Sequence, residues 1–396
     1  YTYEKSFLAP EEWKNQDVVL EFEGIYGTAR VWINGALATV NRNGYMGFSV
    51  DLKPWICYGQ ENLIKIDVDN SNQPNSRWYT GSGIYRDVNL WTGKGVYIPH
   101  DEMKITTLSV NDDVAVVEVC ANVKNTKECG IEAKCYVELI FEGKTVVTEK
   151  QNIVFYSGRK ETVRVQIPVK CPKKWSTDHP NLYQCCVKTY IGDEICDEYT
   201  VDFGIRTLTL DPVNGFQING ETVNLRGTCI HHDNGVIGAE TFPEAEWYRC
   251  KRLKEAGFNA IRSSHHPMSR AMLDACDHLG MLVMDELTDM WNRGKNTYDF
   301  SDIFKEEAPK WIHHMVDKDY NHPSVVIYSV GNEIQEAGTK QGSWINRSLC
   351  NRFHELDATR FTTNALNGLN CAGKRLKVIM KEVIEKFGMD TQGNGS

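Results

Sequence analysis

The stretch SVVIYSVGNEIQEAG, residues 324–338, joins an apolar run directly to polar side chains. Residues 325–328 read Val-Val-Ile-Tyr, a pattern typical of a strand that is buried on both faces, as strands in parallel sheets are. The chain then turns polar at Gly331, Asn332 and Glu333. An amide and a carboxylate at the end of a buried strand indicate a functional site at the edge of a sheet.

The chain around this stretch, from about residue 208 onward, alternates short apolar strands with helices. We expect strands at 225–228, 260–262, 282–284, 325–330 and 361–366, and helices at 244–256, 269–279, 308–320 and 344–356. Strands that alternate with helices of ten or more residues indicate βα units and a parallel sheet. Five strands do not close a parallel barrel, so this region predicts the first part of one.

Polar residues follow these strands at the points where they end. In a parallel barrel the carboxyl ends of all strands lie on one face, and that face carries the active site. Side chains far apart in the sequence are therefore expected to converge, namely His231, Arg262, His265, Asp285 and Glu333. Carboxylates, histidines and an arginine without a cysteine ligand favour acid/base chemistry on a polar, neutral substrate.

The first half of the chain has the pattern of β-structure. Apolar and polar residues alternate at 18–23, 29–33 and 62–68, and Asn34-Gly35 after the second run is a strong turn signal. Short strands with frequent Gly and Asn turns predict a sandwich or jelly roll up to about residue 91. A second series of candidate strands fits a small Ig-like sandwich, at 114–119, 133–140, 162–167, 183–190 and 199–203.

Composition and charge exclude several classes of protein. The chain has 396 residues and a net charge of −9, which argues against a nucleic-acid partner because phosphate binding needs a basic surface. No apolar run approaches the ~18 residues of a membrane-spanning helix. The 13 cysteines include no CxxC pair, which disfavours a zinc ribbon or a redox motif and predicts a reducing, cytoplasmic location.

Glycoside hydrolysis is a reaction that the converging residues could catalyse. It needs two carboxyl groups that flank one bond, and in a retaining enzyme these groups lie about 5 Å apart. One of them must stay protonated near neutral pH. Burial at the end of a strand is the expected cause, because it raises the pKa of a carboxyl group.

Six motifs, in unchanged order along the chain, resemble those of glycoside hydrolase family 2, the family of β-galactosidases and β-glucuronidases. They are ARVWING (29–35), NSRWYTGSGIYRDVNLW (75–91), LRGTCIHHDNGVIG (225–238), FNAIRSSHHPMSRAMLDACDHLGMLVMDE (258–286), SVGNE (329–333) and LDATRFTTNALNG (356–368). The resemblance implies a multidomain β plus α/β fold. It would consist of a jelly-roll sugar-binding domain at 1–97, incomplete at its N-terminus, an Ig-like β-sandwich at 98–207 and the first part of a TIM (β/α)8 barrel at 208–396.

The resemblance also implies roles for the residues of the SVGNE motif. Glu333 would be the general acid/base, and Asn332 would hydrogen-bond the 2-hydroxyl of the sugar. The nucleophile of the family is a glutamate on a later barrel strand, and no residue of this sequence matches it. We therefore expect the barrel domain to be truncated before that strand and the nucleophile to lie beyond Ser396.

Four further positions fall where the family contacts the sugar or the nucleophile. His231, Asp233 and His265 match positions that bind sugar hydroxyls, and Arg262 matches an arginine that supports the nucleophile. By the resemblance, these four side chains would surround the sugar next to Glu333.

Three more candidates have two readings each. Arg77 and Trp78 lie in a jelly-roll loop that reaches the mouth of the active site in the family, or that simply packs on the surface. Asp285 follows the third barrel strand, and we expect a structural role for at least one of Asp285 and Glu286, through pairing with an arginine such as Arg262.

Neither a metal nor a cofactor is predicted. Some family members bind magnesium through a Glu and a His shortly after the third strand, where this chain reads DMWN (289–292). The stretch HHD (231–233) could be a metal cluster, but neighbouring side chains on an extended segment point in opposite directions, which favours sugar binding. Trp291 and Trp311 are candidate platforms for stacking on a sugar.

These observations predict a retaining exo-β-glycosidase that hydrolyses terminal β-linked sugars by double displacement, with β-galactosides as the preferred substrates. A β-glucuronidase of the same family is one alternative. A non-catalytic carbohydrate-binding protein is an alternative of another class. The expected partner is a small carbohydrate or glycoside, with no nucleic acid and no membrane, and a homo-oligomer is left open.

Overall fold

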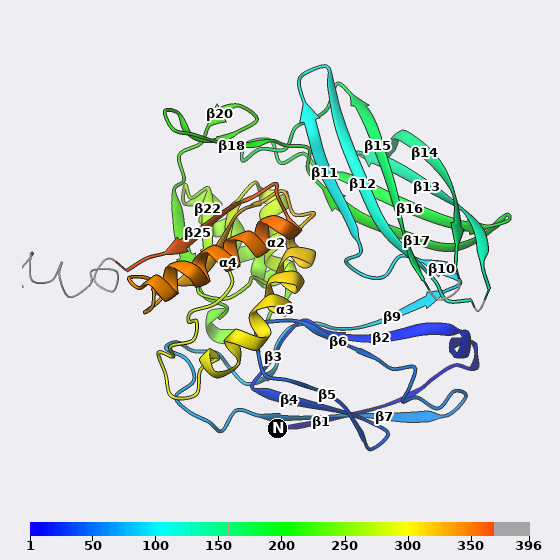
Figure 1. Ribbon diagram of the computed structural model, residues 1–396, viewed down its shortest axis with the longest axis horizontal. Coiled ribbons are helices and arrows are strands. Elements are labelled where there is room, and N and C mark those ends of the chain that lie inside the picture. Colours follow the sequence, from blue (N-terminus) through cyan, green and yellow to red (C-terminus); the bar gives the residue numbers. More distant parts are fainter. Residues whose placement is uncertain (128, 157–158, 368–396) are drawn as a thin grey trace, which may run out of the picture.

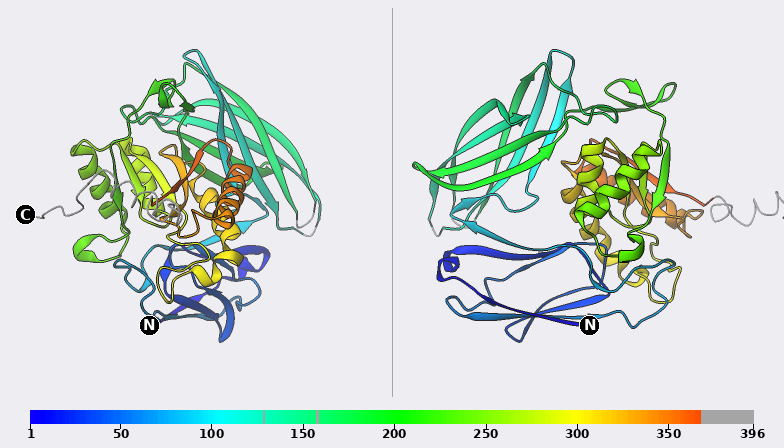
Figure 2. Two further views of the ribbon diagram at one scale, coloured as in Figure 1. Left: turned by 60° about the vertical axis from the view of Figure 1, so that its left-hand side comes forward. Right: turned by 180° about the vertical axis from the view of Figure 1, so that it is seen from behind.

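The computed structural model describes residues 1–127, 129–156 and 159–367, which form three units (Figure 1). Two of the units are β-sandwiches and the third is an α/β unit. In the views of Figures 1 and 2 the N-terminal sandwich lies beneath both other units. The last part of the expected barrel domain, 368–396, lies outside the described residues, as does the final glycine of the LDATRFTTNALNG motif.

The N-terminal unit is the jelly-roll sandwich. Every second side chain of β7 (Glu61–Asp69) is buried, so this strand presents one apolar face to the sandwich core. The predicted turn is confirmed, because Asn34 and Gly35 join β4 to β5 with positive φ angles of 50° and 83°. The other elements are β1 Thr2–Leu8, η1 Glu11–Asn15, β2 Gln16–Phe22, β3 Ile25–Tyr26, β4 Thr28–Ile33, β5 Ala36–Asn41, β6 Phe48–Asp51, β8 Gly83–Ile84 and β9 Val88–Lys94, in sheets ordered β1-β7-β4-β5, β6-β2-β9 and β3-β8.

The second unit is the Ig-like sandwich. Its strands are β10 Val96–Tyr97, β11 Met103–Val110, β12 Val114–Asn125, β13 Ile131–Phe141, β14 Lys144–Phe155, β15 Lys160–Lys170, β16 Tyr183–Ile191 and β17 Glu194–Phe203. β12 pairs with β10, β11 and β15, and the opposite sheet has the order β14-β13-β16-β17. Strand β14 was not predicted. It lies at the edge of its sheet and is mostly exposed, so its sequence carries little apolar alternation.

A small antiparallel meander precedes the α/β unit. It consists of β18 (Leu208–Asp211), β19 (Gly215–Ile218) and β20 (Glu221–Thr222). The meander was not predicted either, because its strands have only two to four residues and are too short for a period to be recognised.

The α/β unit contains five parallel strands in sequence order. They are β21 Gly227–Ile230, β22 Ala260–Ser263, β23 Leu282–Glu286, β24 Val325–Asn332 and β25 Phe361–Ala365. Strand β24 is buried at every residue except one, which confirms the doubly buried strand predicted from its sequence. The strands therefore bring their carboxyl ends to one edge of the sheet.

Helices connect these strands and pack against one face of the sheet. They are η2 Gly235–Ile237, α1 Pro243–Glu255, α2 Arg270–Leu279, α3 Ser301–Asp319 and α4 Lys340–Leu356. Helix α3 begins at Ser301, seven residues before the expected start, and includes Pro309. The Asp299 carboxylate accepts hydrogen bonds from Ser301 N (3.1 Å) and Oγ (2.6 Å), which satisfies the first turn and lets the helix start before the proline.

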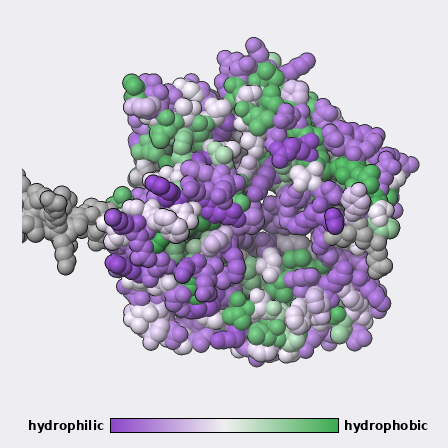
Figure 3. All heavy atoms as spheres, viewed as in Figure 1, coloured by the Kyte–Doolittle hydropathy of each residue, from purple (hydrophilic) through white to green (hydrophobic). Residues whose placement is uncertain are grey.

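The outer surface has both polar and apolar regions. The face seen in Figure 3 is largely hydrophilic, with apolar residues gathered in several separate patches. Within the part of the chain that the structure describes, no helix is long and apolar enough to cross a membrane.

Arg270 connects the units at a buried point. Its guanidinium lies in a close ion pair with Asp101 and within 3.5 Å of Glu21 and 3.6 Å of Glu23. Asp101 N also donates a hydrogen bond to the hydroxyl of Tyr199 (3.2 Å). One cation therefore joins α2 to β2 of the jelly roll and to the loop between β10 and β11 of the Ig-like sandwich. The Arg270 side chain is only 19% exposed, so its ion pairs are shielded from water.

Arg270→Met is expected to lower the free energy of unfolding by about 3–5 kcal/mol, because it leaves several partly buried carboxylates without their cation. Urea unfolding, followed by tryptophan fluorescence, measures the change. Arg252→Met removes an exposed arginine that pairs with Glu255 on α1 and is the matched control, with an expected effect below about 1 kcal/mol. Equal small effects of the two substitutions would contradict the role of Arg270.

Candidate active site

The ends of three neighbouring strands meet at the carboxylate of Glu286. Arg262 of β22 donates to both of its oxygens, at 2.8 and 3.0 Å. Ser329 Oγ of β24 lies 2.6 Å from Oε2, and Nδ1 of His265 lies 2.7 Å from Oε1. Glu286 is fully buried and both of its oxygens are occupied, so it holds the other side chains in place. The predicted pairing of Arg262 with one of the two acids Asp285 and Glu286, which end β23, is confirmed.

Asn332 is held by hydrogen bonds at both ends of its amide. Its Oδ1 accepts a bond from Arg262 (2.8 Å), and its Nδ2 donates to Asp289 Oδ1 (2.7 Å). The residue is 2% exposed, so it has no room to turn its amide over. Among the described residues, Nδ2 donates to Asp289 and to no other acceptor, although an amide nitrogen carries two hydrogens.

Asp289 accepts hydrogen bonds from two cations as well as from the Asn332 amide. Lys295 Nζ lies 2.7 Å from its Oδ1 and also donates to the carbonyl oxygen of Asn332 at 2.8 Å. Arg77, from the jelly-roll loop, donates through NH2 at 2.7 Å and through Nε at 3.2 Å. Burial acts to raise the pKa of Asp289, but the hydrogen bonds from these three side chains outweigh it, and the pKa lies below its usual value.

Lys295 was missed by sequence analysis. It lies in the irregular segment between β23 and α3, where no periodic pattern indicates which side chains turn inward. The only signal was its position shortly after a strand end of the sheet. Asp289 was considered only as part of a magnesium stretch, and in the structure its carboxylate faces Arg77 and Lys295.

Glu333 extends from the end of β24 beyond Asn332. Its φ angle is 44°, a left-handed conformation that is uncommon for a residue with a side chain, and its N–H donates to the carbonyl oxygen of Ala365 (2.6 Å). Arg77 NH1 lies 3.9 Å from Oε2, and Asn367 Nδ2 donates to Oε1 at 3.2 Å. The side chain is 43% exposed, so the burial expected of an acid at a strand end is only partial.

Two of the predicted histidines and Trp78 form an aromatic wall next to this edge. The Trp78 ring lies 4.9 Å from that of His231 and 5.4 Å from that of His265, between ring centres. Trp78 Nε1 donates to the hydroxyl of Tyr45 (3.1 Å), which fixes the indole. Because Nδ1 of His265 faces Glu286, its Nε2 is left for a ligand. Burial is the largest cause that lowers the pKa of His231, and the charge of the neighbouring His265 is the second.

The structure does not bring two of the candidate acids into this network. Asp285 is fully buried, but its carboxylate accepts from Met268 N (2.9 Å) and lies 3.4 Å from Lys318 Nζ, on the side of α3. Neighbouring side chains of a strand point in opposite directions, so Glu286 faces the site and Asp285 faces away from it. Asp233 is partly buried beside His231 and makes no side-chain hydrogen bond within the described residues.

The two tryptophans proposed for sugar stacking belong to the core, and that prediction is wrong. Trp291 is fully buried and its Nε1 donates to the carbonyl oxygen of Val330 (2.9 Å). Trp311 is 5% exposed and packs among the residues of α3 and the sheet. Large aromatic side chains near a strand end fill the space between helices and sheet as readily as they face a ligand.

Behind the aromatic wall, His232 and His266 are buried. The His266 ring stacks on Tyr45 with 4.1 Å between ring centres, and burial lowers its pKa to about 3. His232 Nδ1 lies 3.3 Å from Arg86, and burial holds its pKa well below the usual value. Both rings are therefore neutral at physiological pH and support the wall rather than contact a ligand.

Two sets of side chains in the described residues have the spacing of metal ligands, and neither includes a residue of the network around Glu286. Each set has three histidine or carboxylate atoms within 4.8 Å of one another: Glu21, His100 and Asp101, and Asp274, Asp277 and His322. Arg270 already neutralises Asp101 in the first set, and His322 Nδ1 lies 2.5 Å from Asp277 in the second.

Three family models match the sequence in succession. The model described as "Glycosyl hydrolases family 2, sugar binding domain" matches residues 1–94, "Glycosyl hydrolases family 2" matches 96–206, and "Glycosyl hydrolases family 2, TIM barrel domain" matches 212–392. These matches follow the order of jelly roll, Ig-like sandwich and partial TIM barrel, which confirms the predicted fold class.

Individual relatives of the chain carry the names of β-glycosidases. "Beta-galactosidase BoGH2A" of Bacteroides ovatus is 36% identical over 84% of this chain, and "Putative beta-glucuronidase" of Formosa agariphila is 34% identical over 84%. The alignments span 39% and 31% of those proteins, so the chain is much shorter than either. The crystal structure of a glycosyl hydrolase family 2 member from Bacteroides cellulosilyticus has a TM-score of 0.91 and 37% identity, over 94% of this chain and 48% of that one.

The buried histidine predicts a dependence of stability on pH. The folded-state pKa of His266, about 3, lies below the unfolded value of about 6.5, so its contribution is complete above pH 6.5 and is lost as the pH falls toward 3. His266→Phe keeps a ring against Tyr45 and removes the titration. Between pH 7 and pH 5, the free energy of unfolding is expected to fall by about 2 kcal/mol less in His266→Phe than in the unsubstituted protein.

Urea unfolding at the two pH values measures this difference. His179→Gln, at an exposed position in the Ig-like unit, is the control and should leave the pH dependence unchanged. Parallel pH profiles for His266→Phe and the unsubstituted protein would show that His266 is not held neutral in the folded state.

Proposed function

The chain belongs to glycoside hydrolase family 2, and we propose that it carries the general acid/base, Glu333, of a retaining exo-β-glycosidase that hydrolyses terminal β-linked sugars. The observation that carries this proposal is the position of Glu333 directly beyond Asn332, whose amide is fixed by Arg262 and Asp289. A fixed amide next to an accessible carboxyl group is suited to a substrate that must present a hydroxyl and a glycosidic oxygen together.

The proposed reaction is a double displacement. In the first step Glu333 protonates the glycosidic oxygen while a carboxylate nucleophile attacks the anomeric carbon, so that the bond to the leaving group breaks and a glycosyl-enzyme forms. In the second step Glu333 takes a proton from a water molecule, which attacks the anomeric carbon and releases the nucleophile. No nucleophile is assigned among the described residues.

The surrounding side chains are proposed to bind the sugar. The second hydrogen of Asn332 Nδ2 would donate to the 2-hydroxyl, a contact that strengthens in the transition state. Nε2 of His265, together with His231 and Asp233, would contact other hydroxyls, and Trp78 would supply an apolar wall. Arg262 would support the nucleophile while it keeps Asn332 in place.

Arg77 is proposed to act on the side of the leaving group. Its guanidinium is anchored by Asp289 and lies 3.9 Å from the Glu333 carboxylate, the group that must approach the glycosidic oxygen. The jelly-roll unit would therefore help to build the active site. We also propose three domains, at 1–97, 98–207 and 208–396. The family matches end at 94 and 206 and resume at 96 and 212, which supports boundaries close to these, and the pairing of β10 with β12 favours a first boundary near 95.

The preferred substrate is proposed to be a β-galactoside. One of the relatives named above is a β-galactosidase and the other a putative β-glucuronidase, so a β-glucuronidase is the second candidate. Two cations near Glu333, Arg77 and Lys295, would suit a substrate carboxylate, but Asp289 already neutralises one of their charges.

Glu333→Gln is expected to lower kcat/KM for β-glycosides with poor leaving groups by about 10²–10⁴-fold, because these substrates need a proton on the departing oxygen. Dinitrophenyl glycosides, which leave without protonation, should lose much less in the formation of the glycosyl-enzyme. Steady-state kinetics on both substrate types test this, with Glu306→Gln, an exposed residue of α3, as the control. Equal and mild losses on both substrates would remove Glu333 from the acid/base role.

Hydrolysis of nitrophenyl β-galactoside and nitrophenyl β-glucuronide by the intact protein separates the candidate functions. We expect kcat/KM for the galactoside to be higher by about two orders of magnitude, since the carboxylates of Asp289 and Glu333 lie next to Arg77 and Lys295 and would oppose a carboxylate on the substrate. The reverse preference would make the protein a β-glucuronidase. Hydrolysis of neither substrate would favour a non-catalytic carbohydrate-binding protein.

A further inference from the structure

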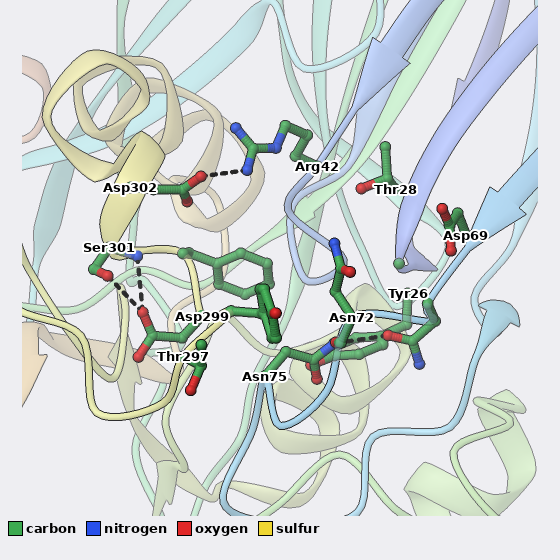
Figure 4. Close-up of a pocket in the computed structure, with 14 residues that line it drawn as sticks. Tyr26, Thr28, Arg42, Asp69, Asn72, Asn75, Thr297, Asp299, Ser301 and Asp302 are labelled. Carbon is green, nitrogen blue, oxygen red and sulfur yellow. Dashed lines mark hydrogen bonds and ion pairs between the residues drawn. The ribbon is translucent and has the colours of Figure 1, made fainter.

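A polar pocket, separate from the network around Glu286, lies between the jelly roll and the segment that leads into α3 (Figure 4). It has a volume of about 170 Å³. Thr28, Asn72 and Asn75 line it from the jelly roll, and Thr297 and Tyr298 line it from the α/β unit. None of these residues takes part in the network around Glu286.

The walls of this pocket are held by one hydrogen bond between the two units and by others within the jelly roll. Tyr298 N donates to the carbonyl oxygen of Pro74 (3.2 Å), which ties the two segments to each other. Asn75 Nδ2 donates to Asn70 Oδ1 (2.8 Å), and Asn75 Oδ1 accepts from the Tyr26 hydroxyl (3.2 Å). The pocket is therefore formed by segments of both units and does not depend on a single loop.

The charged side chains at the pocket all have protein partners. Arg42 NH2 lies 2.5 Å from Asp302, and Figure 4 shows this ion pair at one side of the pocket. The Asp299 carboxylate accepts from the backbone N–H groups of Lys295 (2.6 Å) and Ser301 (3.1 Å). Asp69 contributes one further carboxylate, whose Oδ1 accepts from Ser71. Among the described residues that line the pocket, three carboxylates face one cation, Arg42, which is paired with Asp302, so a free anion is disfavoured.

The groups that remain are neutral hydrogen-bonding groups. Within the ranges 1–127, 129–156 and 159–367, the side chains of Thr28, Asn72 and Thr297 form no hydrogen bond to the protein. Two hydroxyls and one amide supply both donors and acceptors. Tyr298, which is 51% exposed, adds a ring next to them. Neutral polar groups around an aromatic ring match the hydroxyls and the C–H face of a pyranose.

We propose that this pocket binds a neutral pyranose unit of a glycan, at a position distinct from the active-site sugar. The same two segments also reach the active site, because Arg77 follows Asn75 and Lys295 precedes Thr297 by two residues each. The unit could therefore belong to the distal part of a bound substrate or to a separate glycan chain. The binding itself does not depend on the role of Glu333, and its test is a direct measurement of affinity.

The test uses the double variant Asn72→Ala/Thr297→Ala in the intact protein. Ligand-observed NMR titrations with cellobiose and maltose, neither of which is a β-galactoside, give dissociation constants, and kcat/KM is measured for a nitrophenyl monoglycoside and for an oligosaccharide of the same sugar. The loss of two hydrogen bonds is expected to weaken disaccharide binding by about threefold to tenfold or more. Asn152→Ala, at an exposed position of β14, is the control, and thermal unfolding verifies that both variants fold.

Each outcome decides one point. Weaker binding with a lower kcat/KM for the oligosaccharide alone supports the pocket as a distal subsite of the substrate. Weaker binding with unchanged kinetics supports a site for a separate glycan. Dissociation constants equal to those of Asn152→Ala for both disaccharides would overturn the proposal. Failure to hydrolyse any nitrophenyl glycoside would count against the proposed function and leave the binding result to be judged separately.

Discussion

The ion pair between Arg262 and the buried Glu286 is the interaction on which the geometry of the site depends. A carboxylate removed from water is costly unless its oxygens are occupied, and those of Glu286 receive Arg262, Ser329 and His265. Three strand ends are thereby fixed relative to one another. Arg262 has a further donor for the Asn332 amide, so the position of the residue before Glu333 follows from the same pair.

A second constraint links the jelly roll to this edge. Asp289 accepts hydrogen bonds from Arg77 on one side and from Asn332 and Lys295 on the other, so a loop of the first unit is connected to the sheet of the third. Asp289, Asn332 and Lys295 are shielded from water, which strengthens these hydrogen bonds, whereas the Arg77 side chain is 38% exposed. The same hydrogen bonds therefore fix both the arrangement of the units and the shape of the site. The polar pocket lies between the segments that carry Arg77 and Lys295.

Much of this architecture could be predicted from local patterns. The apolar run of β24 and the polar residues after it placed Glu333 at the edge of a parallel sheet, because a strand buried on both faces needs no tertiary information to be recognised. The exposed edge strand β14 has no such pattern and was missed. Sequence could not tell which of Asp285 and Glu286 faces the site, since that depends on the register of β23, and Lys295 reaches it from an irregular segment.

Chemical rescue of Glu333→Ala tests the central claim most directly. Loss of an acid/base carboxyl leaves space on the side of the sugar that water approaches, whereas loss of a nucleophile leaves space on the opposite side. If Glu333 is the acid/base, azide will restore the turnover of a dinitrophenyl β-glycoside by the intact variant, and the product will be the β-glycosyl azide. No rescue by azide, or an α-glycosyl azide as the product, would contradict the account.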